Sequence, residues 1–274
     1  MFIETHAHLD HPKFSEDLPA VIQRAQEAGV KRIVSIGTGI KSSQEIVTLA
    51  ESFPSVFAAI GIHPTEIGDE KGDFISELRE LAKHLKVVAL GEIGIDYFHL
   101  PKENMSLEEI DLWKKNQADA FQQQLDLAVE LGLNVIIHQR DVAGSTGAWE
   151  DVLRILKRYT GKLRSVFHCF GGTPAQAEEV IALGHLVSFT GIITFKNAPL
   201  VRTTAAAIPA DAYMVETDCP YLAPDPYRGQ RAEPWHTRLV AEKMAEVRGL
   251  TLEEVAAATT KTAEAFFKSS LKFY

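Results

Sequence analysis

The stretch Phe2-Ile3-Glu4-Thr5-His6-Ala7-His8-Leu9-Asp10 decides how the rest of the chain is interpreted. Its apolar start predicts a buried strand, which runs directly into two histidines separated by one residue. Successive side chains of an extended backbone point to opposite faces, so His6 and His8 share one face. Two neutral imidazoles on one face form half of a divalent-metal site. The remaining ligands must then come from later strands.

The composition is that of an ordinary globular protein, with 274 residues of which 46% are hydrophobic and 24% charged. A net charge of -9 argues against a protein that coats nucleic acid through bulk charge, although a small cationic pocket is compatible with it. The two cysteines form no disulfide framework, which suits a reducing compartment. No run approaches the roughly 18 apolar residues of a membrane helix. We therefore expect a soluble cytoplasmic protein with no membrane association and no obligate protein partner.

Short apolar segments alternate with helical patterns along the whole chain. After the first strand, the predicted strands cover residues 31–36, 56–62, 87–90, 134–137, 165–167, 186–189 and 213–216. They lack polar–apolar alternation, as expected for strands buried on both faces. Eight such units predict an α/β protein, a single-domain (β/α)8 TIM barrel over residues 1–274, with a doubly wound open sheet as the alternative.

Two further features lie outside the basic repeat of the predicted barrel. A polar insertion occupies about residues 97–106, and additional helices follow the last strand at the C-terminus. Ser106 with Glu109, and Thr251 with Glu254, have the spacing of capping boxes and predict helix starts.

Ligand-type side chains stand at the ends of five predicted strands: His6, His8, Glu92, His138, His168 and Asp218. A barrel brings strand ends together at its C-terminal mouth, whereas an open sheet would spread them along an edge. Six ligands are too many for one tetrahedral ion and suit two ions with Glu92 as a bridging carboxylate. Mixed nitrogen and oxygen ligands do not identify the metal, so Mg, Mn and Zn all remain open.

Three further side chains are predicted at the same mouth as substrate-binding residues. His63 ends a predicted strand and can donate to a substrate phosphate, or can only brace the turn that follows. Arg140 shares the face of His138 and can hold a phosphate with two hydrogen bonds, or pair with a neighbouring carboxylate. Arg231, in the loop after the last strand, has the same two interpretations.

These motifs resemble those of the TatD-type metal-dependent deoxyribonucleases, a branch of the amidohydrolase-like barrel hydrolases. The similarity covers essentially the whole chain in the same order. The matching stretches are Thr5-His6-Ala7-His8, Gly61-Ile62-His63-Pro64, Gly91-Glu92-Ile93-Gly94-Ile95-Asp96-Tyr97, Ile136-Ile137-His138-Gln139-Arg140-Asp141, His168-Cys169-Phe170-Gly171-Gly172 and Glu216-Thr217-Asp218-Cys219-Pro220-Tyr221-Leu222.

The resemblance implies a distribution of ligands over two divalent ions. One ion would be held by His6, His8 and Asp218, and the other by His138 and His168, with Glu92 as the bridge. Glu92 and Asp218 would be the catalytic residues, because Asp218 would also orient or deprotonate the attacking water.

The family's substrates are phosphodiesters, so the resemblance implies an exonuclease acting on single-stranded or frayed DNA ends. Family members commonly carry Arg-Asn-Glu-Pro after the last strand, whereas this chain has Ala232 in place of the asparagine and continues with Trp235. The substrate contacts of this loop are therefore left open.

Two other classes of function share the predicted barrel. One is a hydrolase of a small amide, ester or lactone, because fold and metals alone do not select the bond. Such enzymes often bridge their metals with a modified lysine from the fourth strand, where this chain has Glu92, which favours the phosphodiesterase. The other is a metal-binding scaffold without turnover, and the intact ligand set with Asp218 argues against it.

Overall fold

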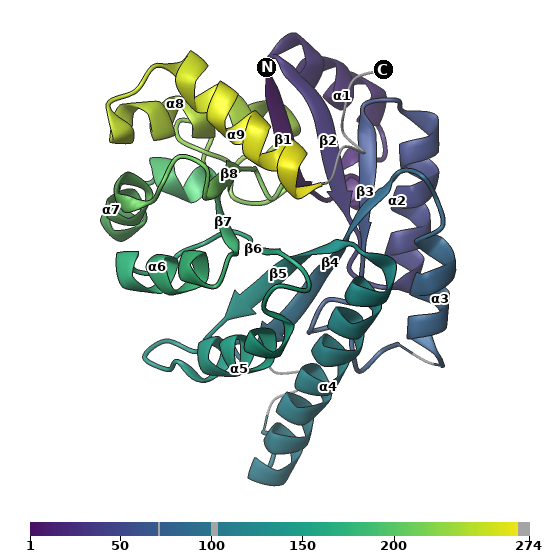
Figure 1. Ribbon diagram of the computed structural model, residues 1–274. Coiled ribbons are helices and arrows are strands. Elements are labelled where there is room, and N and C mark those ends of the chain that lie inside the picture. Colours follow the sequence, from purple (N-terminus) through teal and green to yellow (C-terminus); the bar gives the residue numbers. More distant parts are fainter. Residues whose placement is uncertain (71, 100–103, 268–274) are drawn as a thin grey trace.

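The computed structural model describes residues 1–70, 72–99 and 104–267 (Figure 1). Within these residues a single parallel sheet contains eight strands in sequence order. The strands are β1 (Phe2–Ala7), β2 (Val30–Ile36), β3 (Val56–Ile60), β4 (Val87–Asp96), β5 (Asn134–Arg140), β6 (Ser165–Phe167), β7 (Leu186–Phe189) and β8 (Tyr213–Val215). Nearly every strand residue is buried, as the lack of alternation predicted.

The sheet closes between β1 and the chain that follows β8. Ala7 forms a parallel bridge with Cys219. The N–H of Asp218 donates to the carbonyl oxygen of His6 at 2.9 Å, and the N–H of His8 donates to that of Cys219 at 2.8 Å. Closure confirms the predicted (β/α)8 barrel over the open sheet. It also sets three predicted ligands side by side on two adjacent backbones.

Next to this closure, the side chain of Glu4 forms hydrogen bonds with the main chain of both segments. Its buried Oε1 accepts hydrogen bonds from the N–H of His6 at 2.9 Å and of Thr217 at 3.0 Å. Its Oε2 is hydrogen-bonded to the hydroxyl of Thr237, the first residue of α8 (Thr237–Arg248). One carboxyl group therefore ties β1 to the segment after β8 and to the helix that packs over both.

Helices surround the strands (Figure 1). Besides α8 they are α1 (Leu18–Glu27), α2 (Ile40–Ser52), α3 (Phe74–Leu81), α4 (Leu107–Leu131), α5 (Gly147–Leu156), α6 (Pro174–Ala182), α7 (Pro199–Ala207) and α9 (Leu252–Phe266). Both predicted capping boxes are confirmed, at Ser106 before α4 and at Thr251 before α9. Of the polar insertion near 97–106, residues 100–103 lie outside the described residues. In the part of the chain that the structure describes, no helix is long and apolar enough to cross a membrane.

Helix α9 covers the N-terminal end of the barrel. Phe266 and Phe267 are almost completely buried and share an apolar cluster with inward-facing strand residues such as Ile3, Phe57 and Met214. Burial of these aromatic rings seals the end of the barrel where the strands begin. The predicted ligands stand at the other end, where the strands finish.

Strand β4 is longer than the sequence predicted. Its expected end was Leu90, but its pairing with β5 continues as far as Asp96 opposite Arg140. Side chains four residues apart on a strand share a face, so Glu92 and Asp96 both point into the barrel mouth. This extension corrects the predicted boundary and adds a carboxylate to the mouth.

Candidate metal centre

The two histidines of the first motif point toward two carboxylates. The Nε2 atom of His6 lies 3.3 Å from Glu92 Oε2 and 3.7 Å from Asp218 Oδ1. The Nε2 atom of His8 lies 3.3 Å from the same Asp218 oxygen. The other ring nitrogen of His8 is 3.2 Å from the carbonyl oxygen of Ile36, to which it can donate. Donation through that nitrogen would leave Nε2 of His8 as the ring atom that faces the cluster and can bind a metal.

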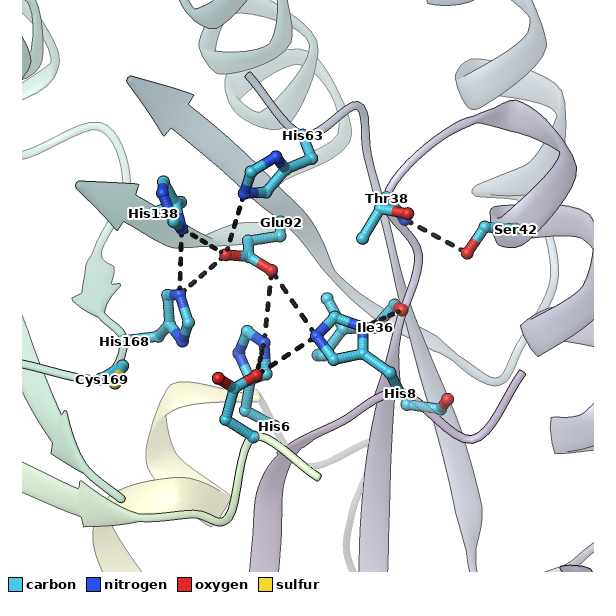
Figure 2. A network of polar contacts seen from close by, with 12 residues as sticks. His6, His8, Ile36, Thr38, Ser42, His63, Glu92, His138, His168 and Cys169 are labelled. Carbon is cyan, nitrogen blue, oxygen red and sulfur yellow. Dashed lines mark hydrogen bonds and ion pairs between the residues drawn. The ribbon is translucent and has the colours of Figure 1, made fainter. Parts of the chain in front are cut away.

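Glu92 lies at the middle of the cluster, with imidazoles on both sides (Figure 2). Its Oε2 faces His6 and, at 3.8 Å, His8. Its Oε1 faces the remaining imidazoles, which are His168 at 2.7 Å, His138 at 2.8 Å and His63 at 3.6 Å. The two oxygens of the buried Glu92 carboxylate thus face different groups of imidazoles. This is the geometry that a bridging ligand needs.

Glycines on both sides of Glu92 allow the carboxylate to approach β5. A Cβ atom on Gly91 would lie 2.6 Å from Cβ of Ile136. A Cβ atom on Gly94, whose φ is +145°, would lie 2.0 Å from the carbonyl oxygen of His138. Only glycine fits such a close backbone approach and such a φ angle. The Gly-Glu-Ile-Gly motif therefore brings Glu92 against His138 through packing.

Two carboxylates that the ligand prediction did not include contact the same imidazoles. Asp96 Oδ2 lies 3.0 Å from Nε2 of His138. Glu216 Oε1 lies 3.5 Å from Nδ1 of His168 and accepts a hydrogen bond from the backbone N–H that follows this histidine. Carboxylates in such positions orient ligand histidines and raise their basicity. Strand alternation from Glu92 would have revealed Asp96 if β4 had been predicted at its full length.

The carboxylates of the cluster are held ionised. Burial would raise the pKa of Glu92, but the charge of His168 and the hydrogen bonds from His138 and His168 lower that pKa well below its usual value. Burial acts in the same direction on the pKa of Asp218, where the hydrogen bond with His8 and the nearby imidazoles outweigh it. Anionic carboxylates in a buried site are what divalent cations require.

The imidazoles respond to their positions differently. Burial lowers the pKa of His63 to about 3, so this ring is neutral near pH 7. Burial also lowers the pKa of His6. Neither ring nitrogen of His6 has a hydrogen-bond partner among the described residues, although the ring is completely buried. A buried polar group left without such a partner is costly, and a metal ion at Nε2 would supply one.

The ligand atoms gather in groups that suit metal ions. In the described part of the chain, donor atoms lie within 4.8 Å of one another in three groups: His6, His8 and Asp218; His63, Glu92 and His138; and His6, His168 and Glu216. The first group matches one predicted ion position. The second contains His63, which was predicted only as a substrate-binding residue. The donor set therefore fits divalent metal ions, and all six predicted ligands converge.

The two predicted arginines occupy different environments. Arg140 ends β5 at the exposed rim, and its guanidinium carbon lies 4.2 Å from the centre of the Phe98 ring. Arg231 donates to Asp17 at 2.8 and 2.9 Å and to Glu233 at 2.6 Å. A phosphate would have to compete with these two carboxylates for the guanidinium. The substrate-binding roles of both arginines stay predictions.

A closed (β/α)8 barrel with histidines and carboxylates converging where its strands end defines the class of metal-dependent hydrolase barrels. The family model described as TatD related DNase matches residues 3–268. The chain belongs to this family, as its motifs predicted.

Relatives of similar length support the same class. The chain is 38% identical over 269 residues to the "Uncharacterized metal-dependent hydrolase YabD" of Bacillus subtilis, covering 98% of this chain and 99% of the relative. It is 34% identical to the "3'-5' ssDNA/RNA exonuclease TatD" of Erwinia tasmaniensis, covering 95% and 97%. The crystal structure of the TatD homologue YjjV from Escherichia coli superposes with a TM-score of 0.86 at 30% identity, covering 97% of each chain. The protein is thus a metal-dependent hydrolase.

Proposed function

We propose that this hydrolase cleaves phosphodiester bonds and removes nucleotides from exposed single-stranded or frayed DNA ends. The observation that carries the proposal is the two-sided environment of Glu92, whose oxygens face separate groups of imidazoles. Two metal positions joined by one carboxylate suit a displacement at phosphorus, because both the attacking and the leaving oxygen need stabilisation. The ester-cleaving class follows from the family, and the nucleic-acid substrate is the further step.

The predicted ligands divide between two divalent ions in this proposal. His6, His8 and Asp218 would hold one ion, and His138 and His168 the other, with Glu92 shared. Bound divalent ions supply positive charge to the reacting phosphate and lower the pKa of a nearby water. The ligand set accommodates Mg, Mn or Zn, so the metal has to be identified by measurement.

Asp218 is proposed as the proton acceptor for the attacking water. Its lowered pKa keeps the carboxylate ionised near neutral pH, which a general base needs. One of its oxygens faces His6 and His8, and the side chain remains partly exposed toward the mouth. His63, Arg140 and Arg231 are proposed to hold the phosphate, since all three can donate to an oxyanion.

The preference for ends follows from the closed barrel and the charge. A net charge of -9 repels a polyanion at long range, so affinity must come from a few contacts near the cluster. A strand end can enter a barrel mouth, whereas the interior of a duplex offers no free terminus. The exonuclease name of the Erwinia tasmaniensis relative agrees with this choice.

The test is an assay with end-labelled single-stranded oligonucleotides, the purified protein and a panel of Mg, Mn and Zn. The proposal expects stepwise shortening that stops with a chelator and with Glu92→Gln. A covalently closed single-stranded circle of the same sequence should remain intact. Efficient cutting of the circle would refute the preference for ends. Absence of cleavage with every metal, together with hydrolysis of lactones or aryl esters, would favour the small-substrate alternative.

A further inference from the structure

Two half-exposed aromatic side chains lie near the candidate metal centre, one in the segment after β4 and one in the segment after β8. Phe98 is 46% exposed and Tyr221 is 48% exposed, whereas most large apolar side chains of the chain are buried. Phe98 is the second residue after β4, and Tyr221 lies three residues after Asp218. Exposed aromatic rings next to a catalytic centre call for a partner with a flat face.

The position of Phe98 is set by a carboxylate that also contacts a predicted metal ligand. Its N–H donates to Asp96 Oδ1 at 2.8 Å. The other oxygen of Asp96 lies 3.0 Å from Nε2 of His138. His99 donates from its N–H to Asp96 at 2.8 Å as well, so the turn that carries Phe98 is held at two points. Phe98 is therefore fixed relative to the His138 side of Glu92.

Arg140 completes the surface around Phe98. Its guanidinium lies against the phenyl ring at 4.2 Å, within the range of a cation–π contact. Within the described ranges 1–70, 72–99 and 104–267, the Arg140 guanidinium has no carboxylate partner. A guanidinium stacked on a ring keeps its N–H donors at the edge of the plane. The pair thus combines a stacking surface with a free donor for phosphate, the combination typical of single-strand binding sites.

Tyr221 occupies the corresponding place on the His8 side. Its N–H donates to the carbonyl oxygen of Asp218 at 3.0 Å. Its ring centre lies 6.2 Å from that of His8 and 5.6 Å from that of His11, with both ring pairs nearly perpendicular. These contacts hold the ring beside the metal centre while half of the residue stays exposed.

We propose that Phe98 and Tyr221 stack on the two nucleobases on either side of the scissile phosphate. The inference rests on the proposed function, because it assumes that the phosphate lies at Glu92. That carboxylate has His138 on one side and His8 on the other, so a phosphate there has one aromatic residue on each side. Stacking does not depend on charge, and an acidic protein can use it to hold a polyanion. The site would then accept any base sequence, since every base has a flat face.

The experiment combines variants that lack one aromatic ring with substrates that lack one base. Single-stranded oligonucleotides carry a tetrahydrofuran abasic residue at the terminal or at the penultimate position, and kcat and KM are measured for the metal-loaded enzyme. On the intact oligonucleotide, Phe98→Leu and Tyr221→Leu should each raise KM by about 5- to 150-fold. Each variant should match the wild type on the abasic substrate that lacks its own base. The two variants should match at different positions.

Phe98→Trp should retain the wild-type KM because it keeps a flat ring. Leu85→Ala is the matched control, since Leu85 is 92% exposed in the turn before β4 begins, at the opposite end of the barrel. A 2-aminopurine at each position supplies a readout besides turnover, because stacking on a ring quenches its fluorescence on binding.

Each outcome decides the proposal. An equal loss on intact and abasic substrates would assign Phe98 to bracing Asp96 instead, and no loss on either would remove the stacking role. If both variants match the wild type on the same abasic oligonucleotide, the two rings do not stack on different bases and the two-sided arrangement is overturned. If the wild type neither cleaves nor quenches any oligonucleotide, the proposed function fails together with the inference. Cleavage without quenching overturns the inference alone.

Discussion

Replacing Glu4 with alanine should damage both the stability and the metal centre, although Glu4 is no predicted ligand. The change removes the oxygen that accepts hydrogen bonds from the N–H groups of His6 and Thr217. Each buried N–H without an acceptor costs about 1–3 kcal/mol, so the pair costs about 2–6 kcal/mol. The missing side-chain volume beside Thr237 adds a cavity and increases the loss.

Thermal unfolding and metal analysis measure this effect. In a barrel of this size the loss corresponds to a fall of about 5–20 °C in Tm. The amount of metal bound per molecule should fall as well. The main-chain hydrogen bond between Asp218 and His6 lies next to the hydrogen bonds that Glu4 forms.

Glu4→Gln separates the hydrogen-bonding role from the charge. Burial raises the pKa of Glu4 to about 8, so the carboxyl group is mostly protonated at neutral pH. A glutamine keeps the acceptor for the two N–H groups. Its amide can donate to the Thr237 hydroxyl, which donates to Glu4 in the wild type and can donate to the carbonyl oxygen of Pro234 instead. The variant should therefore keep the wild-type Tm and metal content. Glu178→Ala, an exposed substitution on α6, should change the stability by less than about 0.5 kcal/mol. A Glu4→Ala protein with wild-type Tm, or a Glu4→Gln protein as unstable as Glu4→Ala, would refute the reasoning.

Four more predictions address the proposed chemistry. Loss of an outer-shell partner of a metal costs roughly 10–100-fold in activity, and Glu92→Gln should lower turnover by more than this while Tm is retained. Near wild-type rates after chelation and metal refill would exclude Glu92 as a bridging ligand. Asp218→Asn should lower kcat and kcat/KM together by about 10²–10⁴-fold in steady-state assays, and a raised KM alone would make it a substrate holder. Alanine at His63 or Arg231 should weaken turnover without changing metal content by elemental analysis. Arg231→Ala also removes a partner of Asp17. Hydrogen bonds from Arg231 and Arg24 lower the pKa of the Asp17 carboxyl group to about 2. The stability lost in this variant should therefore be largest above about pH 4 and should vanish as the pH falls toward 2, as Tm against pH would show. The log of oligonucleotide affinity against log salt should have a slope near −1 to −2, and a slope steeper than about −4 would demand many more phosphate contacts.

The sequence by itself determined the barrel and its predicted ligands. Strand and helix periodicities are local patterns, so the sequence alone predicts eight alternating units. Parallel strands of a barrel end at one mouth, and this rule alone predicted that His6, Glu92 and His138 would meet. The structure places a ring nitrogen of His6 at 3.3 Å and one of His138 at 2.8 Å from the Glu92 carboxylate.

The tertiary structure decided what depends on contacts between distant segments. The extension of β4 to Asp96 follows from its pairing with β5, which the sequence of β4 does not reveal. The environment of Arg231 depends on Asp17, which lies 214 residues away along the chain. In the sequence Glu4 is one more residue of a predicted strand. Closure of the barrel brings Thr217 and Thr237 to its carboxyl group. Periodicity reports which face of an element is buried, whereas the partner of a buried polar group is set by how elements pack in three dimensions.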